Sequence, residues 1–224
     1  MSGLLGRGAL VNWGGVIAER EEDYNAWHSL EHMPERLAVP GFRRGRRGVA
    51  VEGTPETLKY FMMYEADTAE VFISKPYLAR LNDPTPWTQR ILSAYVAPSR
   101  TVCRVLASKG RGVGGYNATV QIGSVPELPG WFDELATMRG VIGVHLLEGD
   151  QNLGQQPTTE KKFRESRGEP DRTVSAAVLV DTMDRSAAED AVARILALPF
   201  VDANTVTATV YAIQHVIVAE DAAS

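Results

Sequence analysis

The chain has little cysteine and no long hydrophobic run, and each absence excludes a class of protein. Cys103 is the single cysteine among 224 residues, which excludes an internal disulfide and any metal site built from several cysteines. No apolar run approaches the roughly 20 residues of a membrane-spanning helix. The first residues, MSGLLGRGALVNW, lack the basic and apolar segments of a signal peptide. We therefore expect a cytoplasmic protein in which Cys103 is a buried structural thiol.

Charge and motif content narrow the function further. The 23 basic and 28 acidic side chains give a formal net charge of −5, which argues against a nucleic-acid partner. No G-x-G-x-x-G stands between a predicted strand and a predicted helix, as dinucleotide binding requires, and neither the GxxxxGK[ST] pattern nor the G-x-S-x-G nucleophile elbow occurs. We expect a small-molecule substrate as the partner, with no nucleic acid and no membrane, and we leave open a homodimer of the chain.

Hydrophobic periodicity predicts one order of elements twice along the chain. Strands are predicted at 8–18, 42–53, 57–67, 100–108, 115–124, 141–150, 173–182 and 205–218. Helices are predicted at 21–39, 68–80, 87–95, 128–138 and 185–198. The polar segment 151–172 has no apolar periodicity, and a loop of that length in a compact protein is either a lid or disordered.

The two halves share the order β-α-β-β-α-β, which is that of the ferredoxin-like fold. Trp27 aligns with Trp131 and Gly41 with Gly140, so the chain is internally duplicated. Each half predicts a four-stranded antiparallel sheet with two helices on one face, and its other apolar face needs a cover. We predict an α+β fold in which a first half (1–110) and a divergent second half (111–224) pack sheet to sheet as a barrel-like pseudo-dimer.

The stretch AWHSLEHMPERLAVPGFRRGRR carries a family resemblance. Together with the duplication, it resembles the dimeric α/β-barrel superfamily and in particular its EthD-like members. In those proteins an aromatic residue and a histidine on the first helix precede a proline and a PGF turn, which Trp27, His32, Pro34 and residues 40–42 match. The resemblance covers residues 8–108, and the second half in topology. It implies the barrel fold, within a superfamily that includes lyases, isomerases, monooxygenases and heme proteins.

The same stretch spells H-x-x-E-H between His28 and His32, the ligand pattern of one class of zinc hydrolases. Three observations argue against zinc. Pro34 would remove a backbone hydrogen bond to Leu30 and distort the turn that carries the ligands. No third ligand stands out, and a duplicated α+β chain is not a metalloprotease scaffold. We therefore predict neither a metal nor a cofactor at this helix.

An acid–base site without metal needs only one suitably placed histidine on the helix. Histidine titrates near neutrality, so one imidazole can donate or accept a proton. We predict His32 as the catalytic residue, His28 as the second candidate and Glu31 as a supporting carboxylate. Phe132 and Ala136 occupy the equivalent positions of the second half, which indicates one functional and one supporting half. The alternative is that both histidines lie on a solvated helix face.

Further side chains are candidates for binding the substrate, each with packing as the alternative. Tyr60 and Tyr64 share one face of the strand at 57–67, opposite Phe61 and Met63, and can donate phenolic hydrogen bonds. The substrate-binding candidates are Tyr60, Tyr64, Asn12, Trp13, Trp87 and Arg36. The strand histidines His145 and His215 are interpreted first as core histidines with satisfied hydrogen bonds.

Four arginines surround Gly45 in FRRGRRG: Arg43, Arg44, Arg46 and Arg47. The first interpretation is an edge strand kept soluble by charge, and the alternative is anion binding.

Three functions fit the pattern. The main prediction is a cofactor-independent lyase or isomerase acting by proton transfer, dehydration or decarboxylation on a small apolar carbonyl or aromatic, polyketide-type compound. The first alternative is a heme-dependent or cofactor-free oxidase or monooxygenase of the same superfamily. The second is a non-catalytic accessory protein that binds a small molecule.

Overall fold

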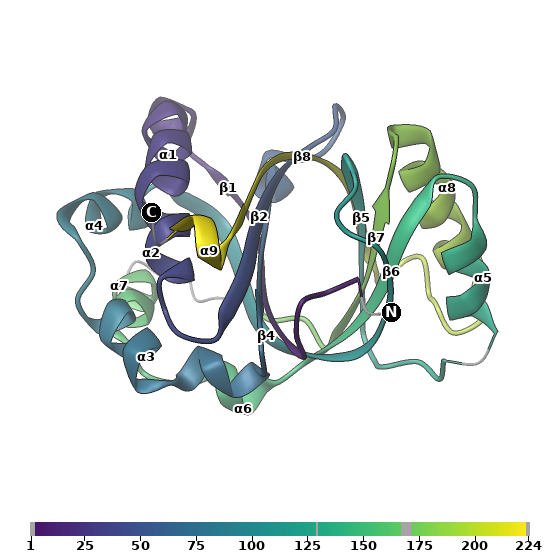
Figure 1. Ribbon diagram of the computed structural model, residues 1–224. Helices are drawn as coiled ribbons and strands as arrows, with labels where there is room; N and C mark the ends of the chain where they lie inside the picture. The colour runs from purple at the N-terminus through teal and green to yellow at the C-terminus, as the bar shows by residue number, and fades with distance from the viewer. Residues whose placement is uncertain (1–2, 129, 167–171, 223–224) are drawn as a thin grey trace.

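In a computed structural model of the protein, eight strands close into a single barrel with helices packed outside it (Figure 1). The structure describes residues 3–128, 130–166 and 172–222. Around the barrel the strands follow the order β1-β3-β2-β8-β5-β7-β6-β4, and each neighbouring pair is antiparallel. The predicted α+β fold, with two duplicated halves that form a barrel, is confirmed.

Each half supplies four consecutive strands, and the halves join along two seams, β2–β8 and β4–β6. The strands of the first half are β1 (Gly8–Val16), β2 (Phe42–Ala50), β3 (Tyr60–Ala66) and β4 (Tyr95–Gly110). Those of the second half are β5 (Tyr116–Ile122), β6 (Val141–Gly149), β7 (Ala176–Thr182) and β8 (Thr207–Val218). At each seam, a strand of one half therefore completes the hydrogen bonding of a strand in the other.

The helices cover the barrel on two opposite sides (Figure 1). The first half carries α1 (Glu21–Trp27), α2 (Met33–Leu37), α3 (Lys75–Asn82) and α4 (Pro86–Leu92). The second half carries α5 (Trp131–Thr137), α6 (Gln151–Gly154), α7 (Thr159–Ser166), α8 (Arg185–Leu196) and α9 (Ala219–Ala222). Short 3-10 turns occupy Ala18–Arg20, Glu56–Leu58 and Ala69–Ile73. Within the described ranges, no helix is long and apolar enough to cross a membrane.

Strand alternation sorts the apolar side chains between the barrel interior and the space under the helices. In β3, Tyr60, Met62 and Tyr64 pack beneath the helices, whereas Phe61 and Met63 lie inside the barrel, as the pattern predicts. The interior is otherwise filled by residues of both halves. It also encloses Cys103, which is fully buried, and burial raises the pKa of its thiol, so the predicted structural role of this cysteine is confirmed.

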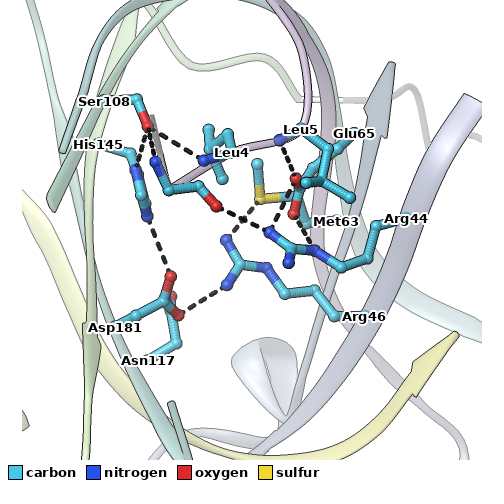
Figure 2. A network of polar contacts seen from close by, with 11 residues as sticks. Leu4, Leu5, Arg44, Arg46, Met63, Glu65, Ser108, Asn117, His145 and Asp181 are labelled. Carbon is cyan, nitrogen blue, oxygen red and sulfur yellow. Dashed lines mark hydrogen bonds and ion pairs between the residues drawn. The ribbon is translucent and has the colours of Figure 1, made fainter. Parts of the chain in front are cut away.

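A chain of polar side chains crosses the barrel interior (Figure 2). Arg46 and Asn117 both donate to Asp181 Oδ1, at 2.6 and 2.8 Å. His145 Nε2 lies 3.0 Å from Asp181 Oδ2, and His145 Nδ1 lies 2.9 Å from Ser108 Oγ. Both nitrogens of His145 are thus engaged, which confirms the prediction of a satisfied core histidine. The network satisfies charges that would otherwise be costly to bury.

The N-terminal segment is tied into the same network (Figure 2). Two backbone amides of residues 3–5 donate to Ser108 Oγ at 3.2 Å each, and the amide of Leu5 donates to Glu65 Oε2 at 2.8 Å. Arg44 donates to a backbone carbonyl of the segment at 3.0 Å and to both Glu65 oxygens. The segment therefore enters one end of the barrel instead of trailing from it.

The interpretation of FRRGRRG as a charged edge strand is wrong. β2 lies between β3 and β8 in the closed barrel, so it has no edge. Arg44, Arg46 and Arg47 are buried, and only Arg43 is exposed. Arg44 and Arg46 pair with the buried carboxylates of Glu65 and Asp181, because closure of the barrel takes their guanidinium groups out of solvent.

Candidate functional site

The first helix contains a π-helical turn at His28–His32, between α1 and α2. Pro34 follows within the first turn of α2. The distortion predicted from Pro34 therefore takes the form of one wider turn, a feature found frequently at functional sites. In this turn the rings of His28 and His32 lie one above the other, with centroids 5.5 Å apart.

A cleft lies between this helix and the outer face of β1 and β3. Four of the predicted residues line it, namely Asn12, His32, Arg36 and Tyr64. Trp13 also borders the cleft, but its indole packs inside the barrel against Phe61 and donates to Thr119 Oγ1 at 3.3 Å. The structure thus gathers residues from a helix and two strands into one site.

His32 is held in the cleft by stacking. The centroid of its ring lies 4.2 Å from the centroid of the Trp27 ring, and the two ring planes are at an angle of 35°. Trp27 is fully buried and donates its indole N–H to Thr88 Oγ1 at 3.1 Å. The indole is thereby fixed at both its face and its edge, so it orients the imidazole above it. The opposite wall is close, because the Tyr64 ring centroid is 6.2 Å from that of His32.

His28 lies behind the cleft and does not line it. It is fully buried among aromatic rings, 5.7 Å from Tyr24 and 5.9 Å from Trp27 between centroids. Burial, followed by the charge of Arg47, lowers its pKa well below the ordinary value, so the imidazole is neutral. The structure therefore supports His28 as a neighbour of the candidate base and not as a group that touches the substrate.

Glu31, the third predicted catalytic residue, also points away from the cleft. Its Oε1 accepts hydrogen bonds from Thr85 at 2.6 Å and from Thr88 at 3.3 Å. Thr85 in turn caps the N-terminus of α4 by accepting from the amide of Thr88. Glu31 thus ties the π-helical turn to α4, and this contact stabilises the helix that carries His32.

Tyr60 and Trp87, two of the predicted substrate-binding residues, lie outside the cleft wall. The Tyr60 hydroxyl donates to Glu21 at 2.6 Å, and burial together with this hydrogen bond raises its pKa to about 12. The Trp87 indole donates to Asp23 at 2.9 Å. Both side chains hold α1 in place by hydrogen bonds, so their role is structural packing and not substrate binding.

Tyr64 differs from Tyr60 in having an unsatisfied hydroxyl. The residue is 2% exposed and lines the cleft, and its hydroxyl has no hydrogen-bond partner in the described part of the chain. Burial raises its pKa well above the ordinary value, against the opposing charges of Arg36 and Arg47. A protonated phenol at this position is available to donate to a bound molecule.

Arg36 connects the cleft to the second half of the chain. Its guanidinium donates to Glu160 at 2.6 Å and lies 5.7 Å from the centre of the Tyr77 ring. Burial disfavours the charged guanidinium, but Glu160 and other acidic groups outweigh it and raise the pKa of Arg36. Arg36 is therefore a permanent cation at the cleft wall.

Glu160 lies in α7, within the polar segment predicted as a lid or as disordered. Residues 151–166 of that segment form α6 and α7, and α7 lies against α3 and α4 on the side of the first half (Figure 1). Residues 167–171 lie outside the described residues. The described part places a second-half side chain in the wall of a first-half cleft, and the lid stays a prediction.

The remaining walls were not predicted. Tyr77 from α3, Tyr95 and Arg100 from β4, and several aliphatic side chains complete the cleft. Arg100 donates to the Tyr77 hydroxyl at 3.2 Å, so this wall also carries positive charge. The signal in the sequence was weak, since an aromatic residue in a helix and an arginine in a strand each fit ordinary packing.

No family model matches the chain, and no curated protein matches it. Solved structures do. An anthrone oxidase-like protein is 11% identical, with a TM-score of 0.55 over 98% of this chain and 96% of that one. A candidate monooxygenase of Fusobacterium nucleatum subsp. nucleatum is 8% identical, with a TM-score of 0.57 over 95% of each chain. A candidate monooxygenase of Lactobacillus acidophilus is 4% identical, with a TM-score of 0.51 over 95% of this chain and 97% of that one.

At these identities the likeness shows the fold alone. It confirms an α+β barrel of eight antiparallel strands with duplicated halves, over nearly the whole chain. Assignment to the EthD-like members stays a prediction. The three structures given above are named as an anthrone oxidase-like protein and two candidate monooxygenases, and none of the three is named as a lyase.

Proposed function

We propose that the cleft binds a small aromatic ketone or phenol and that the protein oxidises it with O₂, without a metal or an organic cofactor. The observation that carries this proposal is the convergence of His32, Tyr64 and Arg36 on one aromatic-lined cleft. The names of the similar structures favour the oxidase alternative over the lyase or isomerase. Non-catalytic binding is the third possibility, and it is distinguished by the absence of turnover.

The chemistry begins with proton transfer. His32, in its neutral form, accepts a proton from a CH₂ group that is conjugated with the ketone through the aromatic ring, and the substrate becomes an enolate with its charge delocalised onto the ketone oxygen. The Tyr64 hydroxyl and the Arg36 guanidinium stabilise the negative oxygen, because both are fixed at the cleft wall before the charge develops. The electron-rich enolate then reacts with O₂ at carbon to give a hydroperoxide, and loss of water leaves a second carbonyl. Overall, CH₂ and O₂ become C=O and H₂O.

The same groups serve a lyase or isomerase up to the enolate. The difference is whether O₂ or a proton reacts with that enolate, which makes O₂ consumption the discriminating measurement. A heme-dependent oxidase would use His32 as its iron ligand, because it is the one histidine that lines the cleft within the described residues. A heme titration followed in the visible spectrum tests that version separately.

The test uses anthrone as the probe substrate, with chelator-treated protein and no added cofactor. We expect O₂ uptake matched by formation of the quinone, and a loss of both in His32→Gln. Conversion of carbonyl substrates without O₂ uptake would favour the lyase or isomerase. Binding of aromatic ketones without conversion of any of them would contradict both enzymatic proposals.

A further inference from the structure

Strand β2 carries four arginines, and three of them have a carboxylate partner. The pairs are Arg43–Asp67 at 2.6 Å, Arg44–Glu65 at 2.8 Å and Arg46–Asp181 at 2.6 Å. The fourth, Arg47, is 6% exposed and forms no ion pair with any residue that the structure describes. A buried guanidinium without a counter-charge is strongly unfavourable, so this position calls for a negative group.

Other unsatisfied polar groups surround Arg47. Its Nε has no hydrogen-bond partner among the described residues, and its single hydrogen bond is a long one, 3.4 Å, to the carbonyl of Asn25. His215 faces it directly across the β2–β8 seam. The Nδ1 of His215 and both ring nitrogens of the fully buried His28 also have no hydrogen-bond partner within the described ranges.

The three side chains form one electrostatic group. Burial lowers the pKa of His28 and of His215, and the charge of Arg47 is the next cause for each. Both imidazoles are therefore neutral, and each keeps one N–H to donate. No carboxylate of the described chain contacts any of the three, so nothing there competes with a bound anion.

We propose that Arg47, His28 and His215 form a binding site for a small oxyanion, a carboxylate or a phosphate. Arginine offers a planar fork of N–H donors that matches both groups, and the imidazoles add one donor each. His215 is only partly buried, which gives the anion a route from solvent. The site lies beside the π-helical turn that carries His28, and the proposal does not depend on the proposed oxidation.

The test follows thermal unfolding of the full chain while phosphate or acetate replaces chloride at constant ionic strength. An anion that binds the folded state raises Tm with concentration, and we expect this rise in the wild type. Arg47→Gln is expected to weaken the apparent affinity by at least about tenfold, as for loss of a charge-assisted contact. Arg43→Gln is the matched control, because Arg43 lies on the same strand but is exposed and already paired.

A second measurement keeps the proposal falsifiable if Arg47→Gln does not fold. Phosphate added to the wild type is expected to shift the imidazole nitrogen resonances of His28 and His215 and to leave those of His145 unchanged. The absence of both the Tm rise and the resonance shifts would overturn the proposal, as would an equal Tm rise in the wild type and in Arg47→Gln.

The anion can be a free ion or a carboxylate on a molecule that occupies the cleft, and benzoate separates these sources. We expect benzoate and acetate to behave alike, which supports a free anion. A gain of benzoate over acetate that disappears in Asn12→Ala would support the same site with the cleft ligand as its source. Benzoate binding that is insensitive to Arg47→Gln would contradict the site.

Discussion

Arg36 of the first half and Glu160 of the second are joined by an ion pair of 2.6 Å, with both side chains buried at the wall of one cleft. The pair spans the duplication, because the helix that carries Arg36 belongs to one half and α7 to the other. It makes the candidate site a property of the whole chain and not of the half that carries the histidines.

Glu160→Gln is expected to destabilise the protein and to weaken substrate binding together. The substitution leaves Arg36 buried without its partner, and breaking such a pair costs about 3–5 kcal/mol. Urea unfolding measures the first effect and KM the second. Glu165→Gln, an exposed position on the same helix, is the control. An unchanged KM with a large loss of stability would show that the pair serves folding alone.

His32→Gln is expected to reduce kcat by about 10²–10⁴-fold, the usual contribution of a positioned general base. Glutamine keeps a polar group beside Trp27 but does not accept the proton. Ligand binding, followed by quenching of tryptophan fluorescence, should persist. Retention of full activity by a folded variant would remove His32 from the mechanism.

Tyr64→Phe and Tyr60→Phe form a matched pair on one face of β3. The Tyr64 hydroxyl lines the cleft without a partner in the described chain, whereas that of Tyr60 is bound to Glu21. We expect Tyr64→Phe to lower kcat by about 10²-fold or more, as for loss of a donor to a developing oxyanion. Tyr60→Phe should leave kcat unchanged and lower the melting temperature. The reverse pattern would disprove the assignment.

His28 makes folding stability depend on pH in a predictable direction. Its pKa in the folded state lies well below the ordinary value, so the unfolded chain takes up a proton at a pH where the folded chain does not. Stability is therefore complete above pH of about 6.5 and falls as the pH drops below it, by at most about 1.4 kcal/mol per pH unit. His28→Phe, which copies Phe132 of the second half, should flatten this slope in chloride buffer.

Asp181 controls stability in a lower pH range. Burial raises its pKa, but Arg46 and His145 outweigh burial, and the net pKa is lowered far below the ordinary value. Its contribution is thus present above about pH 4 and is lost as the pH falls further, toward the pKa of the folded state. Asp181→Asn should cost about 3–5 kcal/mol at neutral pH and reduce the acid slope. Asp190→Asn, exposed on α8, should change neither.

The order of elements and the two faces of β3 follow from the sequence, because both depend on local periodicity. The wider turn before Pro34 is also local, and it was anticipated as a distortion. The partners of FRRGRRG were not predictable in the same way. Whether β2 is an edge depends on β8, at the far end of the chain, and no local pattern reports that pairing.

The candidate site also has one part that follows from local sequence and another that depends on contacts between distant residues. His32, Arg36, Tyr64 and Asn12 carried chemical signals on predicted elements, and the structure brings them together. Glu160 lies in a segment without periodicity, so its approach to Arg36 is decided by packing between the halves. Glu31 was predicted to support His32 because the two residues are adjacent in sequence. Its carboxylate instead accepts a hydrogen bond from Thr85, at the start of α4.

The two seams of the barrel have an evolutionary consequence. A barrel made of two identical chains would carry two equal clefts and would come apart on dilution. Covalent fusion removes the dissociation equilibrium, and it allows the two copies to differ. In this chain the second half packs Trp131, Phe132 and Leu135 into a continuous apolar core. Its helix α7 lies on the side of the first half, where Glu160 forms part of the cleft wall. One copy thus contributes a wall to the cleft of the other.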